Sequence, residues 1–366
     1  MLKHSGLKFR VIYLVFHVVH VDAKVALIKQ TGHRCNHYFT FSNFASNNQN
    51  IMKRLSLAIG LMLLVTQAYS QGCSDAGFCT MGAMKPDQAY SKRINFKLRS
   101  VELSQYRGEA TLTPKIYVTN LDFNFGINAK TTFQVKVPYQ SVTGNLGETS
   151  GIGDLSFSFT RNLHSSEKFD INASIGTKIP TNKSDLKKGD FDFPMYYQVS
   201  LGSVDLIAGA SLISKNWLFA MGYQQALTAN NNHWDQGDAQ RWIDDGLYHN
   251  IDYLKKHPWS TELKRGTDLM VRAERNFRFA KYNFNIGVLP IFRVTKDERL
   301  DEVDGLRKKM DNTTGMALSV LGGFGYHFSV NHSMKVTYGQ KLVQREVNPD
   351  GLTRHNVMIV GYLVRF

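Results

Sequence analysis

Apolar and polar residues alternate with a period of two from about residue 91 to the end of the chain. In the segment 131–139 the odd-numbered positions include Phe133, Val135 and Val137, whereas the even-numbered positions are polar or proline. This alternation predicts β-strands that each have one apolar and one polar face. We expect twelve strands, at 93–105, 110–125, 129–139, 153–163, 168–179, 203–213, 216–228, 267–279, 281–294, 315–328, 333–345 and 355–366.

The connections between these strands alternate in length. Short turns follow the second, fourth, sixth, eighth and tenth strands, and longer polar links follow the odd-numbered strands from the third to the eleventh, including 228–266 and 295–314. Only the first link, near Arg107–Glu109, is short where a long one is expected. An even number of strands with short turns at one end and long loops at the other is typical of an outer-membrane β-barrel.

The sequence therefore predicts an all-β fold for residues 91–366: a transmembrane antiparallel up-and-down barrel of about 12 strands, with short periplasmic turns and long extracellular loops. Lipid satisfies no backbone polar group, so a sheet that spans a bilayer must close on itself. The alternative is a soluble β-sandwich or lipocalin-like barrel, which packs its apolar faces inside. The polar faces of this chain carry too many charges to be one solvated side of a sandwich.

The N-terminal part of the chain has the features of an export signal. A basic start at residue 52 precedes an apolar run over 55–65, and a small-x-small sequence ends at Ser70. This order predicts a secretory signal peptide at 52–70 that directs the chain through the Sec system to the outer membrane. We interpret residues 1–51 as a spurious upstream extension, and a second membrane-associated segment at 11–21 is the alternative.

Residues 71–90 carry two cysteines, Cys73 and Cys79, between the predicted signal peptide and the first strand. An exported chain folds in an oxidising compartment, so a Cys73–Cys79 disulfide is the favoured interpretation. The alternative is lipidation of Cys73, but no leucine stands where a lipobox has one. This stretch is expected on the periplasmic side, either as a plug or rim element of the barrel or as a solvent-exposed leader.

The formal net charge is +14, and half of it belongs to residues 1–70, which hold eight basic residues and one acidic residue. If the apolar strand faces meet lipid, the charged residues on the opposite faces line the lumen, where basic residues outnumber acidic ones by ten to four. These charges either pair to fill and rigidify the interior or form a basic conduit for anionic or polar solutes. The candidate lumen-lining residues are Lys97, Arg99, Lys136, Asp154, Asp170, Lys178, Asp268, Arg272, Glu274, Arg278, Arg293, Lys335, Lys341 and Arg345.

Twelve strands leave an interior too narrow for a wide aqueous pore, since such channels have sixteen strands or more. We expect a transporter or narrow channel for small solutes, with no catalytic residue, metal, cofactor or nucleic-acid partner. Two alternatives stay open. One is a phospholipase-like barrel enzyme, for which His327 faces inward but no serine partner can be assigned. The other is a structural or adhesive barrel that acts through its loops.

The longest loop, 230–260, combines aromatic, acidic and histidine residues. Aromatic rings and carboxylates suit a divalent metal or a carbohydrate, but a solvated lid with a short helix over 239–256 fits the same composition. The residues concerned are His233, Trp234, Asp235, Asp238, Trp242, Asp244, Asp245, His249, His257 and Trp259.

The chain ends in a strand whose alternate residues are apolar up to the last. Gly361, Tyr362, Val364 and Phe366 fit the terminal signal that barrel-assembly machinery recognises by strand addition. This strand must pair with the first one, near 94–98, so that the barrel has no free edge. Phe366 is then expected at the periplasmic interface, where aromatic girdles contact outer-membrane lipid.

Two motifs resemble those of a known family. The segment NFGINAKTTFQVKVPYQSV (124–142) contains Val-Pro-Tyr at 137–139. The segment TSGIGDLSFSFTRNL (149–163) contains Gly-Ile-Gly-Asp at 151–154, just before the next predicted strand. Together they resemble the outer-membrane transporter-like barrels of the meta-pathway phenol-degradation family, distant relatives of the long-chain fatty-acid transporters. The resemblance implies uptake of small aromatic or hydrophobic molecules, although the Asn-Pro-Ala plug motif of fatty-acid transporters is absent. The leader QGCSDAGFCT (71–80) resembles those of Bacteroidota.

Overall fold

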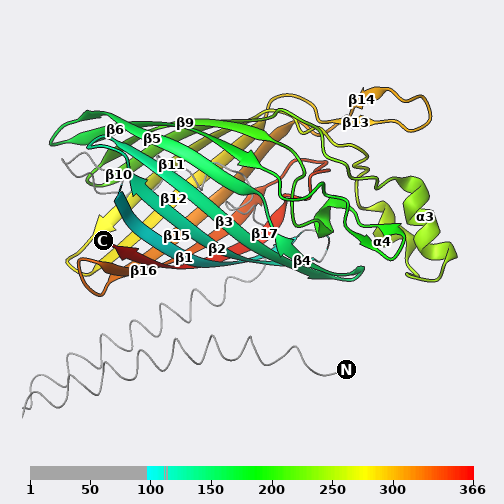
Figure 1. Ribbon diagram of the computed structural model, residues 1–366, viewed down its shortest axis with the longest axis horizontal. Coiled ribbons are helices and arrows are strands. Elements are labelled where there is room, and N and C mark those ends of the chain that lie inside the picture. The colour runs from blue at the N-terminus through cyan, green and yellow to red at the C-terminus, as the bar shows by residue number, and fades with distance from the viewer. Residues whose placement is uncertain (1–96, 111, 113) are drawn as a thin grey trace, which may run out of the picture. The chain divides into compact units, whose positions relative to one another are not determined.

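The computed structural model describes residues 97–366 apart from 111 and 113. Twelve antiparallel strands form a closed barrel in which neighbours along the chain pair with each other and the last strand pairs with the first (Figure 1). The predicted all-β, up-and-down barrel is confirmed. The barrel strands are β1 (Lys97–Ala110), β2 (Lys115–Gly126), β3 (Thr131–Gly144), β5 (Leu155–Ser165), β6 (Phe169–Ile179), β9 (Asp205–Ser214), β10 (Trp217–Ala226), β11 (Asp268–Arg278), β12 (Tyr282–Arg293), β15 (Gly315–His327), β16 (His332–Val343) and β17 (Arg354–Arg365).

Short turns join the strands at one end of the barrel, here called the turn end, and the longer connections lie at the other, the loop end (Figure 1). No helix among the described residues is long and apolar enough to cross a membrane. The smaller elements of the loop end are β4 (Gly147–Ile152), the hairpin of β7 (Lys187–Lys188) and β8 (Phe191–Asp192), the 3-10 helix η3 (Met195–Tyr197), the helices α3 (Gln236–Asp244) and α4 (Ile251–Lys255), and the hairpin of β13 (Glu298–Leu300) and β14 (Arg307–Lys309).

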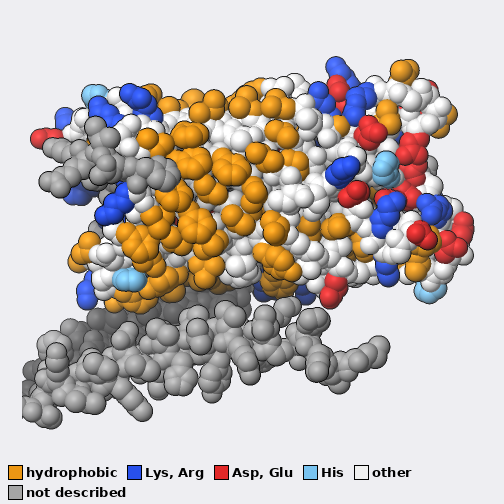
Figure 2. Space-filling view, viewed as in Figure 1, with side chains coloured by type: hydrophobic (Ala, Val, Ile, Leu, Met, Phe, Trp, Pro, Cys, Tyr) orange, Lys and Arg blue, Asp and Glu red, His pale blue; other side chains and the backbone are white. Residues whose placement is uncertain are grey.

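The distribution of side chains is the reverse of that in a soluble protein. On β11, Leu269 and Val271 are exposed, whereas Asp268, Arg272 and Glu274 on the opposite face are buried. Apolar side chains cover the wall between the two ends of the barrel (Figure 2). A closed β-barrel with an apolar outer belt is the outer-membrane type of protein, because lipid accepts the apolar surface and closure satisfies the backbone.

The first turn and the closing seam differ from the sequence prediction. The turn does not lie near Arg107–Glu109, because these residues pair with both β2 and β17 and β1 continues to Ala110. Arg107 and Glu109 are polar because they alternate with buried Tyr106, Gly108 and Ala110, not because the chain turns there. The seam therefore runs from the Ser100–Arg365 pair to the Ala110–Arg354 pair instead of lying near 94–98.

The predicted long link after the third strand, over 140–152, is instead a hairpin that extends the barrel wall. β3 continues to Gly144, and a tight turn leads into β4, which pairs with it. Gly147 begins β4 with a φ of 149°, a conformation that residues with a side chain rarely adopt. Leu146 in the turn and Val142 on β3 are buried, which holds the hairpin against the loop end.

The predicted helix over 239–256 is two shorter helices. Asp235 caps α3 in a capping box with Asp238, and Asn250 caps α4 by accepting a hydrogen bond of 3.0 Å from the Tyr253 amide. Gly246, with a φ of 69°, lies between the two helices and allows the chain to turn.

Candidate functional site

At the loop end, part of one long connection folds inward. Residues 195–201, here called the inward segment, begin with η3 and are all buried. The Gln140 side chain on β3 donates a hydrogen bond of 3.2 Å to the Gln198 carbonyl. On the other side, the Tyr196 hydroxyl donates one of 3.2 Å to the Asn348 carbonyl in the connection between β16 and β17. The inward segment thus bridges the wall and the last loop and occupies the mouth of the barrel.

Aromatic packing covers the inward segment from the loop side. The Tyr197 hydroxyl lies 3.1 Å from the Leu146 amide and 3.0 Å from the hydroxyl of Tyr253 on α4. The Phe193 ring stacks on Tyr197 with the ring centres 5.4 Å apart and also contacts Trp242 on α3. The helices α3 and α4 therefore form a packed lid over the inward segment.

Asp154, from the Gly-Ile-Gly-Asp motif, anchors the inward segment to the wall. Its carboxylate accepts hydrogen bonds from the Ser200 hydroxyl and from the Leu201 amide, the latter at 3.2 Å, and lies 3.4 Å from the Lys178 ammonium. Asp154 is available for this role because the strand is interrupted here: Gly153 donates to the Pro138 carbonyl, and the ladder resumes at β5. Proline is tolerated in β3 at such an interruption.

A second group of buried charges joins the strand ends to the loops. Arg293, the last residue of β12, lies 2.7 Å from Asp268, 2.6 Å from Asp297 and 2.9 Å from Asp350. Arg345 lies 3.6 Å from the same Asp350 carboxylate. We call these five residues the arginine hub. Removing one partner of such a buried network leaves other charges uncompensated, which is strongly destabilising.

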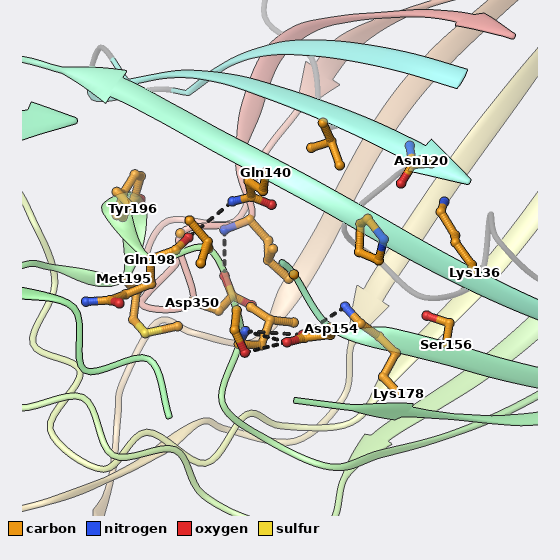
Figure 3. A pocket seen from close by; sticks show the side chains of 18 of the residues that line it. Asn120, Lys136, Gln140, Asp154, Ser156, Lys178, Met195, Tyr196, Gln198 and Asp350 are labelled. Carbon is orange, nitrogen blue, oxygen red and sulfur yellow. Dashed lines mark hydrogen bonds and ion pairs between the residues drawn. The ribbon is translucent and has the colours of Figure 1, made fainter. Parts of the chain in front are cut away.

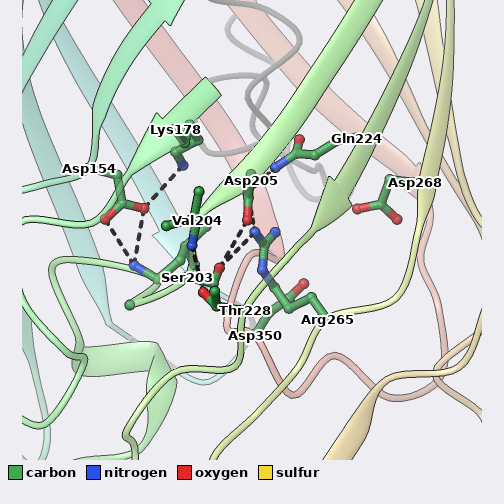
Figure 4. A network of polar contacts seen from close by, with 12 residues as sticks. Asp154, Lys178, Ser203, Val204, Asp205, Gln224, Thr228, Arg265, Asp268 and Asp350 are labelled. Carbon is green, nitrogen blue, oxygen red and sulfur yellow. Dashed lines mark hydrogen bonds and ion pairs between the residues drawn. The ribbon is translucent and has the colours of Figure 1, made fainter. Parts of the chain in front are cut away.

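Arg265 extends this network toward β9. It forms an ion pair with Asp205, which also accepts a hydrogen bond of 2.5 Å from the Gln224 side chain (Figure 4). Burial by itself lowers the pKa of Arg265, but Asp205 and Asp350 reverse this and raise it. The guanidinium therefore stays charged despite its burial.

The two loop carboxylates of the arginine hub respond differently to burial. Burial by itself raises the pKa of Asp350, but Arg293, Arg345 and Arg265 outweigh it and hold the pKa well below its usual range. Burial also raises the pKa of Asp297, and there Arg293 opposes it only in part. Asp350 is thus the fixed anion on which three arginines converge.

A polar cavity of about 60 Å³ lies between the inward segment and the inner faces of β2, β3, β5 and β6 (Figure 3). Its volume holds a few water molecules, so binding of a larger solute requires the inward segment to move. Polar groups in such a cavity can orient a solute while apolar ones contact its body. Its polar lining includes the amides Asn120, Gln140 and Gln198, the cations Lys136, Lys178 and Arg354, and the carboxylates Asp154 and Asp350.

The predicted lumen-lining residues fall into two groups. Nine of them are buried, namely Lys136, Asp154, Lys178, Asp268, Arg272, Glu274, Arg293, Lys341 and Arg345. Several of these form ion pairs, such as Arg272 with Glu274. The other five, nearer the turn end, are half-buried or exposed, namely Lys97, Arg99, Asp170, Arg278 and Lys335. That these residues line a path for solutes stays a prediction.

Sequence reasoning missed Asp205, Arg265, Asp297 and Asp350. Asp205 stands at an inward position of a predicted strand and could have been found by its alternation with Leu206 and Ala208. The other three lie in long connections, where no periodicity indicates which way a side chain points.

Two of the three tryptophans in the longest loop are inside the packed lid, and the third, Trp259, is 37% exposed with the Arg299 guanidinium 4.4 Å from its ring centre. Trp234 and Trp242 are fully buried, and His257 is 1% exposed. Among the described residues, no group of histidine, cysteine and acidic side chains is arranged to hold a metal. His327 has Ser333 as its cross-strand partner, and these two described residues form no hydrogen bond with each other.

At the C-terminus, Gly361 lies against Ser104 and Glu102 of β1, and Tyr362 contacts His332 through a hydrogen bond of 2.9 Å. Phe366 is exposed, and its amide donates to the Arg99 carbonyl. The recognition of this strand by assembly machinery stays a prediction. Cys73, Cys79, the signal peptide and the leader lie outside the described residues.

No family model and no curated protein matches this chain. Solved structures of similar topology include an outer membrane channel from Pseudomonas putida F1, with 11% identity, a TM-score of 0.48 and coverage of 77% of this chain and 99% of that one. Others are the NanC porin, with 10% identity, a TM-score of 0.40 and coverage of 74% and 99%, and the CymD monoaromatic hydrocarbon channel, with 12% identity, a TM-score of 0.38 and coverage of 81% and 98%. At these values the likeness does not carry a function over to this chain.

Proposed function

We propose that this protein is a narrow outer-membrane channel or transporter for small solutes. The observation that carries the proposal is the polar cavity inside an apolar-belted barrel, directly behind the inward segment. A barrel with a purely structural role has no need of a segment whose polar contacts close one mouth over such a cavity. Solute entry from the loop end then requires displacement of residues 195–201.

The chemistry of the cavity supports solutes that carry an anionic or polar group on a small body. Lys136, Lys178 and Arg354 outnumber the two carboxylates Asp154 and Asp350 in its lining. Apolar contacts come from side chains such as Pro138 and Leu201. CymD is by name a monoaromatic hydrocarbon channel. For this chain, small aromatic or hydrophobic solutes are part of the same proposal, in line with the resemblance of its two motifs.

Flux through the full-length protein in liposomes tests the proposal. We expect benzoate to pass faster than benzylamine, which has the same ring but the opposite charge, because the lining has more cations than carboxylates. Toluene uptake in excess of that by protein-free liposomes separates a hydrophobic preference from an anionic one. If none of the three passes faster than into protein-free liposomes, although the protein has folded, the channel proposal is overturned. Faster passage of benzylamine than of benzoate overturns the preference for anions.

The leader 71–90 is part of the same proposal as a plug or rim element on the periplasmic side. Single-channel conductance of the chain with and without these residues tests it. A larger conductance after deletion supports a plug. An unchanged conductance supports the alternative that residues 71–90 are a solvent-exposed leader. Export through the Sec system, assembly by the barrel-assembly machinery and a Bacteroidota source are proposed on the sequence features alone.

One observation favours a second candidate, a barrel that acts through its loops. The hairpin of β13 and β14 exposes Val303 at 97% and Leu306 at 63%, which is unusual for apolar residues in a solvated loop. The test is binding of a cell-surface partner by the protein and by V303S/L306S. This candidate is supported over the channel if the protein shows no solute flux in liposomes but binds the partner, and if V303S/L306S does not bind it.

A further inference from the structure

Two cations interrupt the apolar outer face of the barrel in the half near the turn end. Arg161 on β5 and Arg275 on β11 both alternate with outward apolar residues. Arg161 is exposed between Phe159 and Leu163, whereas Arg275 is half-buried by its neighbours. An arginine on the lipid face of a barrel is unfavourable in a way that depends on its depth, so its position calls for a physical account.

Two aromatic rings hold the Arg275 side chain. Its guanidinium carbon lies 5.0 Å from the centre of the Trp217 ring and 5.7 Å from that of Phe277. Trp217 is the cross-strand partner of Arg275 on β10, and its ring in turn stacks on Phe219 at 5.6 Å. Because both rings are themselves exposed, at 42% and 46%, they form a clamp that fixes the cation on the membrane-facing surface.

No acidic side chain among the described residues forms an ion pair with Arg275. The adjacent carboxylate, Glu274, points to the opposite face of the sheet and pairs with Arg272 inside the barrel. The ring clamp supplies no net negative charge. The counter-charge for Arg275 therefore comes from outside the described part of the chain.

The depth of Arg275 matches the lipid headgroup region. It stands three residues before the end of β11, roughly 10 Å along the strand. Lys215 in the turn between β9 and β10 and Lys281 in the turn between β11 and β12 lie at the edge of the wall, and both are exposed. Figure 2 shows Lys and Arg side chains around the turn end, on the side where β6 and β10 begin. The charge of this edge favours anionic over zwitterionic lipid.

We propose that Arg275, held between Trp217 and Phe277, binds the phosphate of an anionic phospholipid in the leaflet at the turn end of the barrel. The guanidinium donates paired hydrogen bonds to the phosphate oxygens, as this group does with phosphate in general. The rings contact the glycerol and the upper acyl chain. Lys215, two residues from Trp217 in sequence, lies toward the headgroup side of the site.

The site is tested on the full-length protein in detergent, with phosphatidylglycerol as the probe and the lipid-dependent rise in unfolding temperature as the readout. We expect Arg275→Gln to weaken the apparent affinity about fivefold, because one cation near the headgroup is removed. The matched control is Arg161→Gln, which removes an outward cation of similar depth that lacks the ring clamp and leaves the affinity within about twofold. Trp217→Leu keeps an apolar side chain and weakens binding less than Arg275→Gln, because only the clamp is lost.

Three outcomes overturn the proposal. Equal weakening by Arg161→Gln and Arg275→Gln assigns the effect to the overall charge of the turn end. An equal rise in unfolding temperature with phosphatidylcholine shows that the site does not prefer an anionic headgroup. The same rise with inorganic phosphate alone shows that the site binds phosphate and not a lipid. Heat-modifiable migration on a gel shows whether each variant has folded. If Arg275→Gln does not fold, Arg275→Lys replaces it; this variant keeps the charge but loses the paired hydrogen bonds and the planar stacking, so it is expected to bind more weakly than the wild type.

Discussion

The two ends of this barrel are stabilised by different kinds of interaction. At the turn end, the connections are closed by bonds between residues a few positions apart, such as the 3.0 Å bond from the Trp217 amide to the Ser214 hydroxyl. At the loop end, the arginine hub joins Asp268 to Asp350, which are far apart in the sequence. Loss of one local bond at the turn end leaves the other turns intact, whereas loss of one buried charge in the arginine hub leaves its partners uncompensated and destabilises the whole network. We therefore expect single substitutions to destabilise the loop end more than the turn end.

The strongest test of this difference is the removal of the hub arginine. Arg293→Met leaves Asp268, Asp297 and Asp350 buried without their main counter-charge, and we expect a loss of about 3–5 kcal/mol in the stability of the loop end. Hydrogen exchange is the measurement, with faster exchange expected in residues 195–201 and 344–353. Amides of the turn end should keep their protection.

The control for this prediction is Arg307→Met. Arg307 lies 3.0 Å from Glu262 in a half-exposed pair at the same end, where solvent screens the interaction, so the expected loss is below about 1 kcal/mol. Similar exchange in both variants would show that burial of the hub has no special effect.

The same contrast explains what the sequence could predict. The alternation of residues such as Phe133 and Val135 with Gln134 gives the wall of the barrel, because pleat and bilayer impose a period of two on every strand. Asp154, Lys178, Asp268 and Arg293 were found by the same alternation. The pairing of Arg293 with Asp350 and the inward course of 195–201 were not, because they depend on how long loops pack together. Arg107–Glu109 misled the prediction, since a polar strand end resembles a turn.

The lid helices provide a test that depends on pH. Burial lowers the pKa of His257 to about 4, so the neutral form is favoured in the folded lid, and the stability this gives is lost as the pH falls from 6.5 toward 4. Burial raises the pKa of Asp238 to about 6, so that group adds stability at low pH that is lost as the pH rises from about 4 to 6. The two effects oppose each other, and the wild-type lid should change little over this range.

Substitution of either group should unmask the other. In Asp238→Asn, which keeps a cap acceptor, we expect the lid to lose on the order of 2–3 kcal/mol between pH 6.5 and pH 4. In His257→Gln the lid should instead be more stable at pH 4 than at pH 6.5. Limited proteolysis within 230–260 measures both. If the stability of both variants changes with pH in the same direction, the conclusion that His257 and Asp238 have opposite effects is wrong.

Asp154 links the loop end to conduction. Asp154→Asn removes the charge that holds Ser200, the Leu201 amide and Lys178, and we expect about 1–3 kcal/mol less stability for the closed position of the inward segment. Single-channel recordings should show a larger open fraction. Asp170→Asn is the matched control, since Asp170 accepts a hydrogen bond from Ser165 at the turn end and has no contact with the inward segment. A rise in open fraction with both variants places the gate elsewhere.

The smallest effect is expected at the turn end itself. Ser214→Ala removes the hydroxyl that accepts from the Trp217 amide, but this amide is exposed and water replaces the bond, so the loss should be about 0.5 kcal/mol or less. Ser214→Thr, which keeps the acceptor, is the control, and urea unfolding in micelles measures both. Conduction should not change in either variant, because the polar cavity lies at the other end of the barrel. A large loss of stability in Ser214→Ala would contradict the difference between the two ends, because a single exposed bond of the turn end would then matter as much as a charge of the arginine hub.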